Sequence, residues 1–141
     1  MEGPPEIVLA EYGLEGASLA RISVGWINRT YLVEHPRGRF VLQKLHPVFA
    51  PTVHLDIDRI TRHLAHEGLE TPLLVPTARG DLWVDADGTW RLLSFVEGEI
   101  HDRFDAGRAY ASAMLVARFH RALAGLEHTF AFTRPGAHDT A

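Results

Sequence analysis

The stretch LARISVGWINRTYLVEHPRGRFVLQKL, residues 19–45, alternates apolar and polar side chains between clusters of turn residues. Such alternation is typical of half-buried β-strands. It predicts three strands, over residues 19–24, 30–34 and 40–45. The connection between the last two contains Pro36 and Gly38, and proline fixes φ whereas glycine permits positive φ. Because connections this short join antiparallel neighbours, the stretch predicts an antiparallel sheet.

Beyond these strands the apolar spacing becomes that of a helix. Four apolar residues between Val53 and Leu64 lie at i, i+4, i+7 and i+11, which predicts a helix over about residues 52–67. Gly68 is suited to end this helix in a left-handed conformation.

Strand signals return after the helix. Two or three further strands are predicted, over residues 73–76, 81–85 and 90–96. Asp87 and Gly88 form a dipeptide that strongly favours a tight hairpin. Residues 106–126 then predict a second helix.

These elements predict an α+β fold, an antiparallel five-stranded sheet with one covering helix, followed by a helical segment. The strands run from hairpin to hairpin and not through βαβ crossovers. We divide the chain into a lead-in at residues 1–18, with a weak helical pattern at 7–9, a sheet-containing unit at 19–98 and a helical segment at 99–141.

Composition excludes several classes of function. The 141 residues include 14 Lys and Arg against 18 Asp and Glu, so a net charge of −4 argues against a nucleic-acid partner. The absence of cysteine excludes disulfides, thiol catalysis and cysteine-ligated zinc. No apolar run approaches the roughly 20 residues that span a bilayer, so we expect no membrane association and a cytoplasmic location.

The histidines are the only group in the sequence that invites a metal interpretation. His63 and His66 lie three residues apart on the predicted helix, a spacing that can chelate. The sequence places no third ligand beside them, so exposed helix histidines are the favoured interpretation and no metal ligand is assigned. The standard phosphate-loop motifs are also absent.

A turn and a basic residue in the first sheet form the most informative pattern. Gly25 and Asn28 lie at the tip of the first connection, where main-chain N–H groups can face anionic oxygens. Gln43 and Lys44 lie on the third predicted strand. In a kinase-like sheet a basic residue at this place holds nucleotide phosphates and is oriented by a carboxylate from the following helix.

Two choices follow from this pattern. Lys44, the only lysine, is preferred over Gln43 as the phosphate-binding residue, although strand alternation lets only one of the two face the nucleotide. The carboxylate would come from Asp56 or Asp58, and the helical wheel favours Asp56 because it lies beside the apolar stripe.

Four stretches in order resemble the aminoglycoside phosphotransferase and choline kinase superfamily, and its N-acetylhexosamine 1-kinase-like branch most closely. They are GWINRTYLV…GRFVLQK at 25–44, DIDRITRHL…GLETP at 56–72, WRLLSFVEG at 90–98 and FHRAL…RPGAHDT at 119–140. The resemblance covers the chain from about Gly25 to its last residue.

This resemblance implies a kinase-like small lobe that binds ATP, with Mg²⁺ in the complete enzyme, and a small-molecule hydroxyl acceptor such as a sugar or amino sugar. The turn containing Gly25 and Asn28 would lie over the phosphates. The main chain of Ser94, Phe95 and Val96 would form hydrogen bonds with the adenine edge. Members of the family often carry their basic residue where Gln43 stands.

The superfamily performs its chemistry in a second lobe, with a His-Gly-Asp-type loop, a downstream Asn and a metal-binding Asp. None of these motifs occurs in the 141 residues, so no catalytic residue is assigned. We expect the nucleotide-binding lobe of a small-molecule kinase, split or truncated and inactive alone. The alternative is a non-catalytic binding or assembly module. In both cases an uncovered apolar surface predicts a homo-oligomer or a partner chain.

Overall fold

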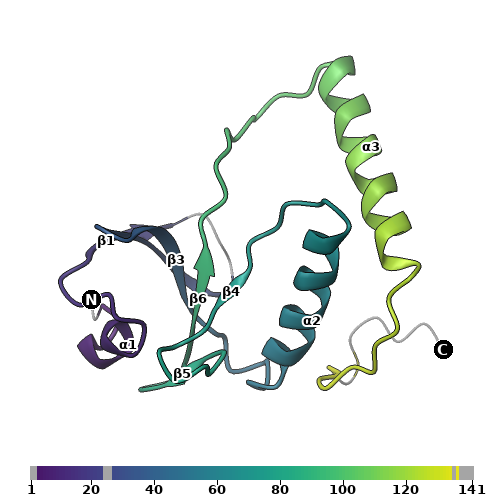
Figure 1. Ribbon diagram of the computed structural model, residues 1–141. Helices are drawn as coiled ribbons and strands as arrows, with labels where there is room; N and C mark the ends of the chain where they lie inside the picture. The colour runs from purple at the N-terminus through teal and green to yellow at the C-terminus, as the bar shows by residue number, and fades with distance from the viewer. Residues whose placement is uncertain (1–2, 24–26, 135, 137–141) are drawn as a thin grey trace.

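Figure 1 shows the computed structural model, which describes residues 3–23, 27–134 and 136. In chain order its elements are α1 (Glu6–Glu11), β1 (Ser18–Ile22), β2 (Arg29–His35), β3 (Gly38–Lys44), α2 (Val53–His66), β4 (Leu74–Val75), β5 (Val84–Asp85), β6 (Thr89–Ser94) and α3 (Ala106–Leu123). The α+β class and the predicted helix over about residues 52–67 are confirmed. No helix among the described residues is long and apolar enough to cross a membrane.

The strands form one antiparallel sheet in the order β1-β2-β3-β6-β4, with β5 also paired to β6. In the described residues the sheet has six strands and not five, because both of the two-residue strands pair with β6. The predicted hairpin before β6 is confirmed. Asp87 and Gly88 there have φ of 48° and 105°, values that glycine and aspartate tolerate best.

One face of the sheet is buried, and we call it the buried face. Its side chains come from β2, β3 and β6 and pack against α1 and the turn that follows α1. The cluster comprises Val8, Leu9, Tyr12, Leu14, Tyr31, Val33, Leu42, Trp90 and Leu92. Residues 8–14 therefore contribute to the core, and α1 covers this face, a role that the sequence assigned to the later helix. Burial of this apolar surface is the main force that holds α1 to the sheet.

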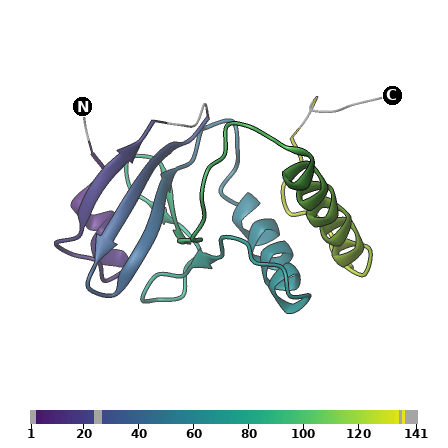
Figure 2. The same ribbon diagram turned by 90° about the horizontal axis from the view of Figure 1, so that it is seen from above.

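Helix α2 packs mainly against α3. Leu64 and Leu69 form a second buried cluster with Ala122, with Ile60 beside them. The ring of His63 also forms a 2.8 Å hydrogen bond between Nε2 and the carbonyl oxygen of Ala122. Figures 1 and 2 both show α2 between the sheet and α3, with α1 on the far side of the sheet. The sheet and the two long helices thus have separate apolar cores among the described residues.

Candidate functional site

The second face of the sheet, which we call the open face, carries only partly buried side chains at its centre. Antiparallel partners share a face, so the register defines its members. These are Thr30 and Leu32 on β2, Val41 and Gln43 on β3, and Arg91 and Leu93 on β6. Leu32, Val41 and Leu93 make an aliphatic surface, and the other three make a polar end beside the β1–β2 connection.

The polar end is a row of hydrogen bonds across three strands. Nε and Nη2 of Arg91 both donate to Oε1 of Gln43, at 2.9 and 2.8 Å. Nε2 of Gln43 donates in turn to Oγ1 of Thr30 at 3.1 Å. Burial lowers the pKa of the Arg91 guanidinium, which means that water stabilises its charge less than it would on the surface.

Lys44 does not belong to this face. Its side chain lies on the side of Trp90, with Nζ 5.5 Å from the ring centroid, and it forms a 3.0 Å ion pair with Asp87 in the hairpin before β6. Gln43 faces the open side, and Lys44 faces the other side because successive strand residues alternate. The preference for Lys44 over Gln43 as the phosphate-binding residue stays a prediction. Lys44 lies on the face of the sheet that also carries the buried ring of Trp90, its cross-strand partner on β6.

Asp56 does not orient a basic residue of the sheet. Its carboxylate accepts hydrogen bonds from Nε2 of His128 at 2.7 Å and from the main-chain N–H groups of Ala131 and Phe132 at 2.8 and 3.0 Å. Burial alone raises the pKa of Asp56, but these hydrogen bonds outweigh it and hold the pKa below its ordinary value. The expected pairing is wrong because this flank of α2 faces the segment after α3.

The alternative carboxylate, Asp58, does not contact the sheet either. It accepts a hydrogen bond from Nε of Arg62, one turn later on α2, at 2.7 Å. Among the described residues, neither carboxylate is therefore paired with Gln43, Lys44 or Arg91.

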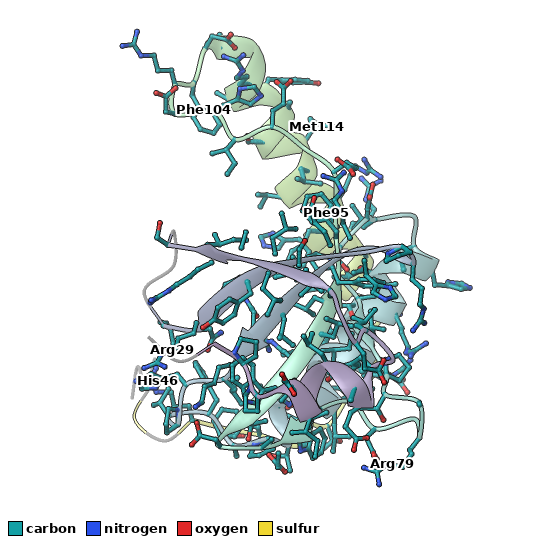
Figure 3. All side chains as sticks on the ribbon, turned by 90° about the vertical axis from the view of Figure 1, so that its left-hand side faces the viewer. Arg29, His46, Arg79, Phe95, Phe104 and Met114 are labelled. Carbon is teal, nitrogen blue, oxygen red and sulfur yellow. The ribbon has the colours of Figure 1, made fainter. Side chains whose placement is uncertain are left out.

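The predicted turn is described in part. Gly25 lies outside the described residues. Oδ1 of Asn28 accepts a hydrogen bond from the main-chain N–H of His46 at 3.0 Å, which joins this connection to the one between β3 and α2. A cavity of about 410 Å³ opens here, with the basic side chains of Arg29, Lys44 and His46 in its lining. Figure 3 shows Arg29 and His46 close together at this end of the molecule.

The segment that leaves β6 is fixed at its start. The N–H of Ser94 donates to the carbonyl oxygen of Leu73 at 2.8 Å, so this group is used within the sheet. The guanidinium of Arg39 lies 4.3 Å from the centroid of the Phe95 ring and also pairs with Glu97. The expected adenine contacts of Phe95 and Val96 stay a prediction, as do all the expected nucleotide contacts.

Most of this chain matches a known protein family. The sequence model of a family described as the phosphotransferase enzyme family matches residues 18–140. The chain belongs to this family. Resemblance to the aminoglycoside phosphotransferase superfamily is thereby confirmed, and the antiparallel sheet is the small lobe of a kinase-like fold.

Two solved structures resemble this phosphotransferase lobe. A microcompartment-associated aminopropanol kinase has a TM-score of 0.65 and 21% identity, with 94% of this chain and 42% of that chain covered. A spectinomycin phosphotransferase in complex with ADP and spectinomycin has a TM-score of 0.50 and 14% identity, with 67% and 29% covered. At these identities the similarity shows the fold, and the chain spans less than half of either protein.

The described His, Asp and Glu side chains do not gather into a metal-binding cluster. No group of three or more His, Asp or Glu side chains among them could hold a metal ion. The ring of His63 forms a hydrogen bond with the carbonyl oxygen of Ala122. Nδ1 of the exposed His66 lies 3.6 Å from Oε1 of Glu67. The Mg²⁺ that the resemblance implies stays a prediction.

Arg91 is the site residue that the sequence analysis missed. A signal was present, because the strand predicted over residues 90–96 carries an arginine between two large apolar residues, Trp90 and Leu92. Arginine is rarely buried without a partner, so its occurrence there points to a special environment.

Proposed function

We propose that this chain is the nucleotide-binding part of a small-molecule kinase and that the open face of the sheet holds ATP. The supporting observation is the order of side chains on that face. Leu32, Val41 and Leu93 offer an aliphatic surface for a base, and the polar end with Arg91 follows directly. Nucleotide pockets combine a largely apolar lining with a few placed polar groups, as this face does.

The nucleotide would lie along β3 and β6. Adenine would rest on Val41 and Leu93, with its edge toward the main chain of Phe95 and Val96. The phosphates would lie toward the β1–β2 connection, where Asn28 forms a hydrogen bond with His46. Mg²⁺ would accompany the phosphates in the complete enzyme and neutralise their charge.

The acceptor is proposed to be a hydroxyl group of a small molecule, best sought among sugars and amino sugars because of the resemblance to N-acetylhexosamine 1-kinase-like proteins. Structural relatives support the small-molecule class: one is an aminopropanol kinase, and another holds spectinomycin together with ADP.

Phosphoryl transfer is proposed to need the part of the fold that this chain does not share with its longer structural relatives. A base for the acceptor hydroxyl and ligands for the metal are required for transfer. Exposed apolar side chains along α3 offer a surface for such a part. They are Tyr110, Met114, Leu115 and Val116. The same surface would suit a non-catalytic assembly module, but the family match and the open face favour the kinase lobe.

Calorimetric titration with ATP tests the proposal. Substitution Val41→Phe fills the aliphatic surface and should weaken ATP binding about tenfold or more, equivalent to about 1.4 kcal/mol. Leu19→Phe is the matched control, because it adds similar bulk to a partly exposed leucine on the other face of the sheet. The control should bind ATP like the wild type. Equal affinity in wild type and Val41→Phe would exclude the open face as the nucleotide site.

A further inference from the structure

Among the residues that the structure describes, Arg91 carries a positive charge with no carboxylate paired to it. Its strand, β6, lies between β3 and β4, its side chain is partly buried on the open face, and burial lowers its pKa. Arginine nevertheless stays protonated in proteins. Buried charges are normally paired with an opposite charge, because an unpaired one is costly to remove from water. Among the described residues, however, no carboxylate oxygen lies within 4.0 Å of a nitrogen of Arg91.

The side chain that holds Arg91 is an uncharged amide. Because the amide nitrogen of Gln43 donates to Thr30, the amide oxygen is turned toward the guanidinium. Gln43 therefore orients Arg91 through two hydrogen bonds and leaves its charge intact. A carboxylate at this position would form the same two hydrogen bonds but would cancel the charge.

Two other ionisable groups near this end of the sheet, His54 and Asp85, have hydrogen-bond partners of their own. His54 is fully buried, and its Nδ1 lies 2.6 Å from the carbonyl oxygen of Pro51. Burial, together with the charge of Arg91, lowers the pKa of His54. Asp85 accepts hydrogen bonds from Thr89 and Trp83. The positive charge of the polar end is thus that of Arg91.

We propose that Arg91 is the phosphate-binding cation of this lobe and that Gln43 is its positioning residue. This inference rests on the proposed function, since it names the group that receives the phosphates at that site. A guanidinium has five N–H donors, and only two are used by Gln43, so three remain for phosphate oxygens. The aliphatic surface begins two residues along the same strands, roughly 7 Å away, which suits a base joined to phosphates.

The experiment measures the binding of ATP, adenosine and inorganic tripolyphosphate by calorimetry at low salt. The variants are Arg91→Met, Arg91→Lys and, as the matched control, Lys44→Met. Arg91→Met should weaken ATP binding about tenfold or more, abolish tripolyphosphate binding and leave adenosine binding unchanged. The ATP affinity of Arg91→Lys should fall between, because one ammonium nitrogen cannot replace the two guanidinium nitrogens that both donate to Oε1 of Gln43. Lys44→Met removes one charge from the other face and should keep the preference for ATP.

The outcomes separate this inference from the proposed function. A wild-type chain that binds neither ATP nor adenosine would contradict the proposed function. A wild-type chain that binds adenosine as tightly as ATP, or Arg91 variants that keep the preference for ATP, would overturn the assignment of Arg91 alone. Circular dichroism reports whether each variant is folded. If Arg91→Met is not folded, Arg91→Lys decides, because it retains the charge and the aliphatic stem.

Discussion

Nε2 of His128 lies 2.7 Å from Oδ1 of Asp56, although 72 residues separate the two in the chain. The Asp56 side chain is almost fully buried, and two main-chain N–H groups, of Ala131 and Phe132, complete its hydrogen bonds. The ring of Phe132 also packs edge-on against that of Phe49, at 6.1 Å between centroids. The hydrogen bonds of the Asp56 carboxylate therefore connect the segment after α3 to the first turn of α2.

Removal of the Asp56 carboxylate should destabilise the fold strongly. Asp56→Ala leaves three partly buried hydrogen-bond donors without their acceptor, and we expect a loss of about 2 kcal/mol in the free energy of unfolding. Asp58→Ala, on the same helix, removes a partner of the exposed Arg62 and should cost no more than about 0.5 kcal/mol. Chemical denaturation of the two variants measures both values. Equal losses would show that the Asp56 hydrogen bonds contribute no more than a surface pair.

The same contact predicts a dependence of stability on pH. Because the folded state lowers the pKa of Asp56 below its ordinary value of 3.8, the unfolded state binds the proton more readily, and stability rises with pH through this range. The contribution is complete above the ordinary pKa and is lost as pH falls toward the lowered one. The difference in unfolding free energy between wild type and Asp56→Ala should therefore shrink below about pH 4. A difference that stays constant down to about pH 2.5 would contradict the lowered pKa.

Gln43→Glu should abolish the uncompensated charge of Arg91 while it preserves the hydrogen bonds between them. We expect ATP affinity to fall about tenfold or more, with a weaker dependence on salt. Gln43→Met, of similar length, removes the hydrogen bonds but leaves the positive charge, so its loss should be smaller. Titrations with ATP at two salt concentrations compare the variants. A larger loss in Gln43→Met than in Gln43→Glu would mean that orientation matters more than charge.

Gly88 should not tolerate a side chain. Its φ of +105° is strained for other residues, and a Cβ there would lie 2.5 Å from Cε of Lys44. Gly88→Ala should lower the free energy of unfolding by about 1–2 kcal/mol. Gly98→Ala is the control, because a Cβ at Gly98 meets no atom within 4 Å and its φ is not positive. Thermal unfolding compares them, and equal midpoints would contradict the strain argument.

Local patterns in the sequence predicted most elements because they depend on neighbouring residues. The helix from Val53 to His66 follows from its apolar spacing, and the hairpin at Asp87 and Gly88 follows from backbone preference. The choice between Gln43 and Lys44 could not be made this way. Alternation says that the two side chains point to opposite faces, but the face that α1 buries is decided by tertiary packing.

Contacts between residues far apart in the chain could not be predicted from the sequence, because they too depend on tertiary packing. Nothing local to Asp56 reveals that its partners come from His128 and the residues after it. The helical wheel placed Asp56 correctly on the flank of the apolar stripe, yet the neighbour on that flank is the segment after α3 and not the sheet. Arg91 was visible as an unusual residue in a strand, but its partner Gln43 became apparent only from the register.

Separate apolar cores have a mechanical consequence. Val8, Val33 and Leu92 hold the sheet to α1, whereas Leu64 and Ala122 hold α2 to α3. Cooperative opening follows shared packing, so amide protons of the sheet should exchange with solvent deuterium as one group and those of the paired helices as another. The sheet and the helix pair should therefore open separately, with the boundary between β4 and α2. That boundary lies inside the unit at residues 19–98 that the sequence analysis treated as one.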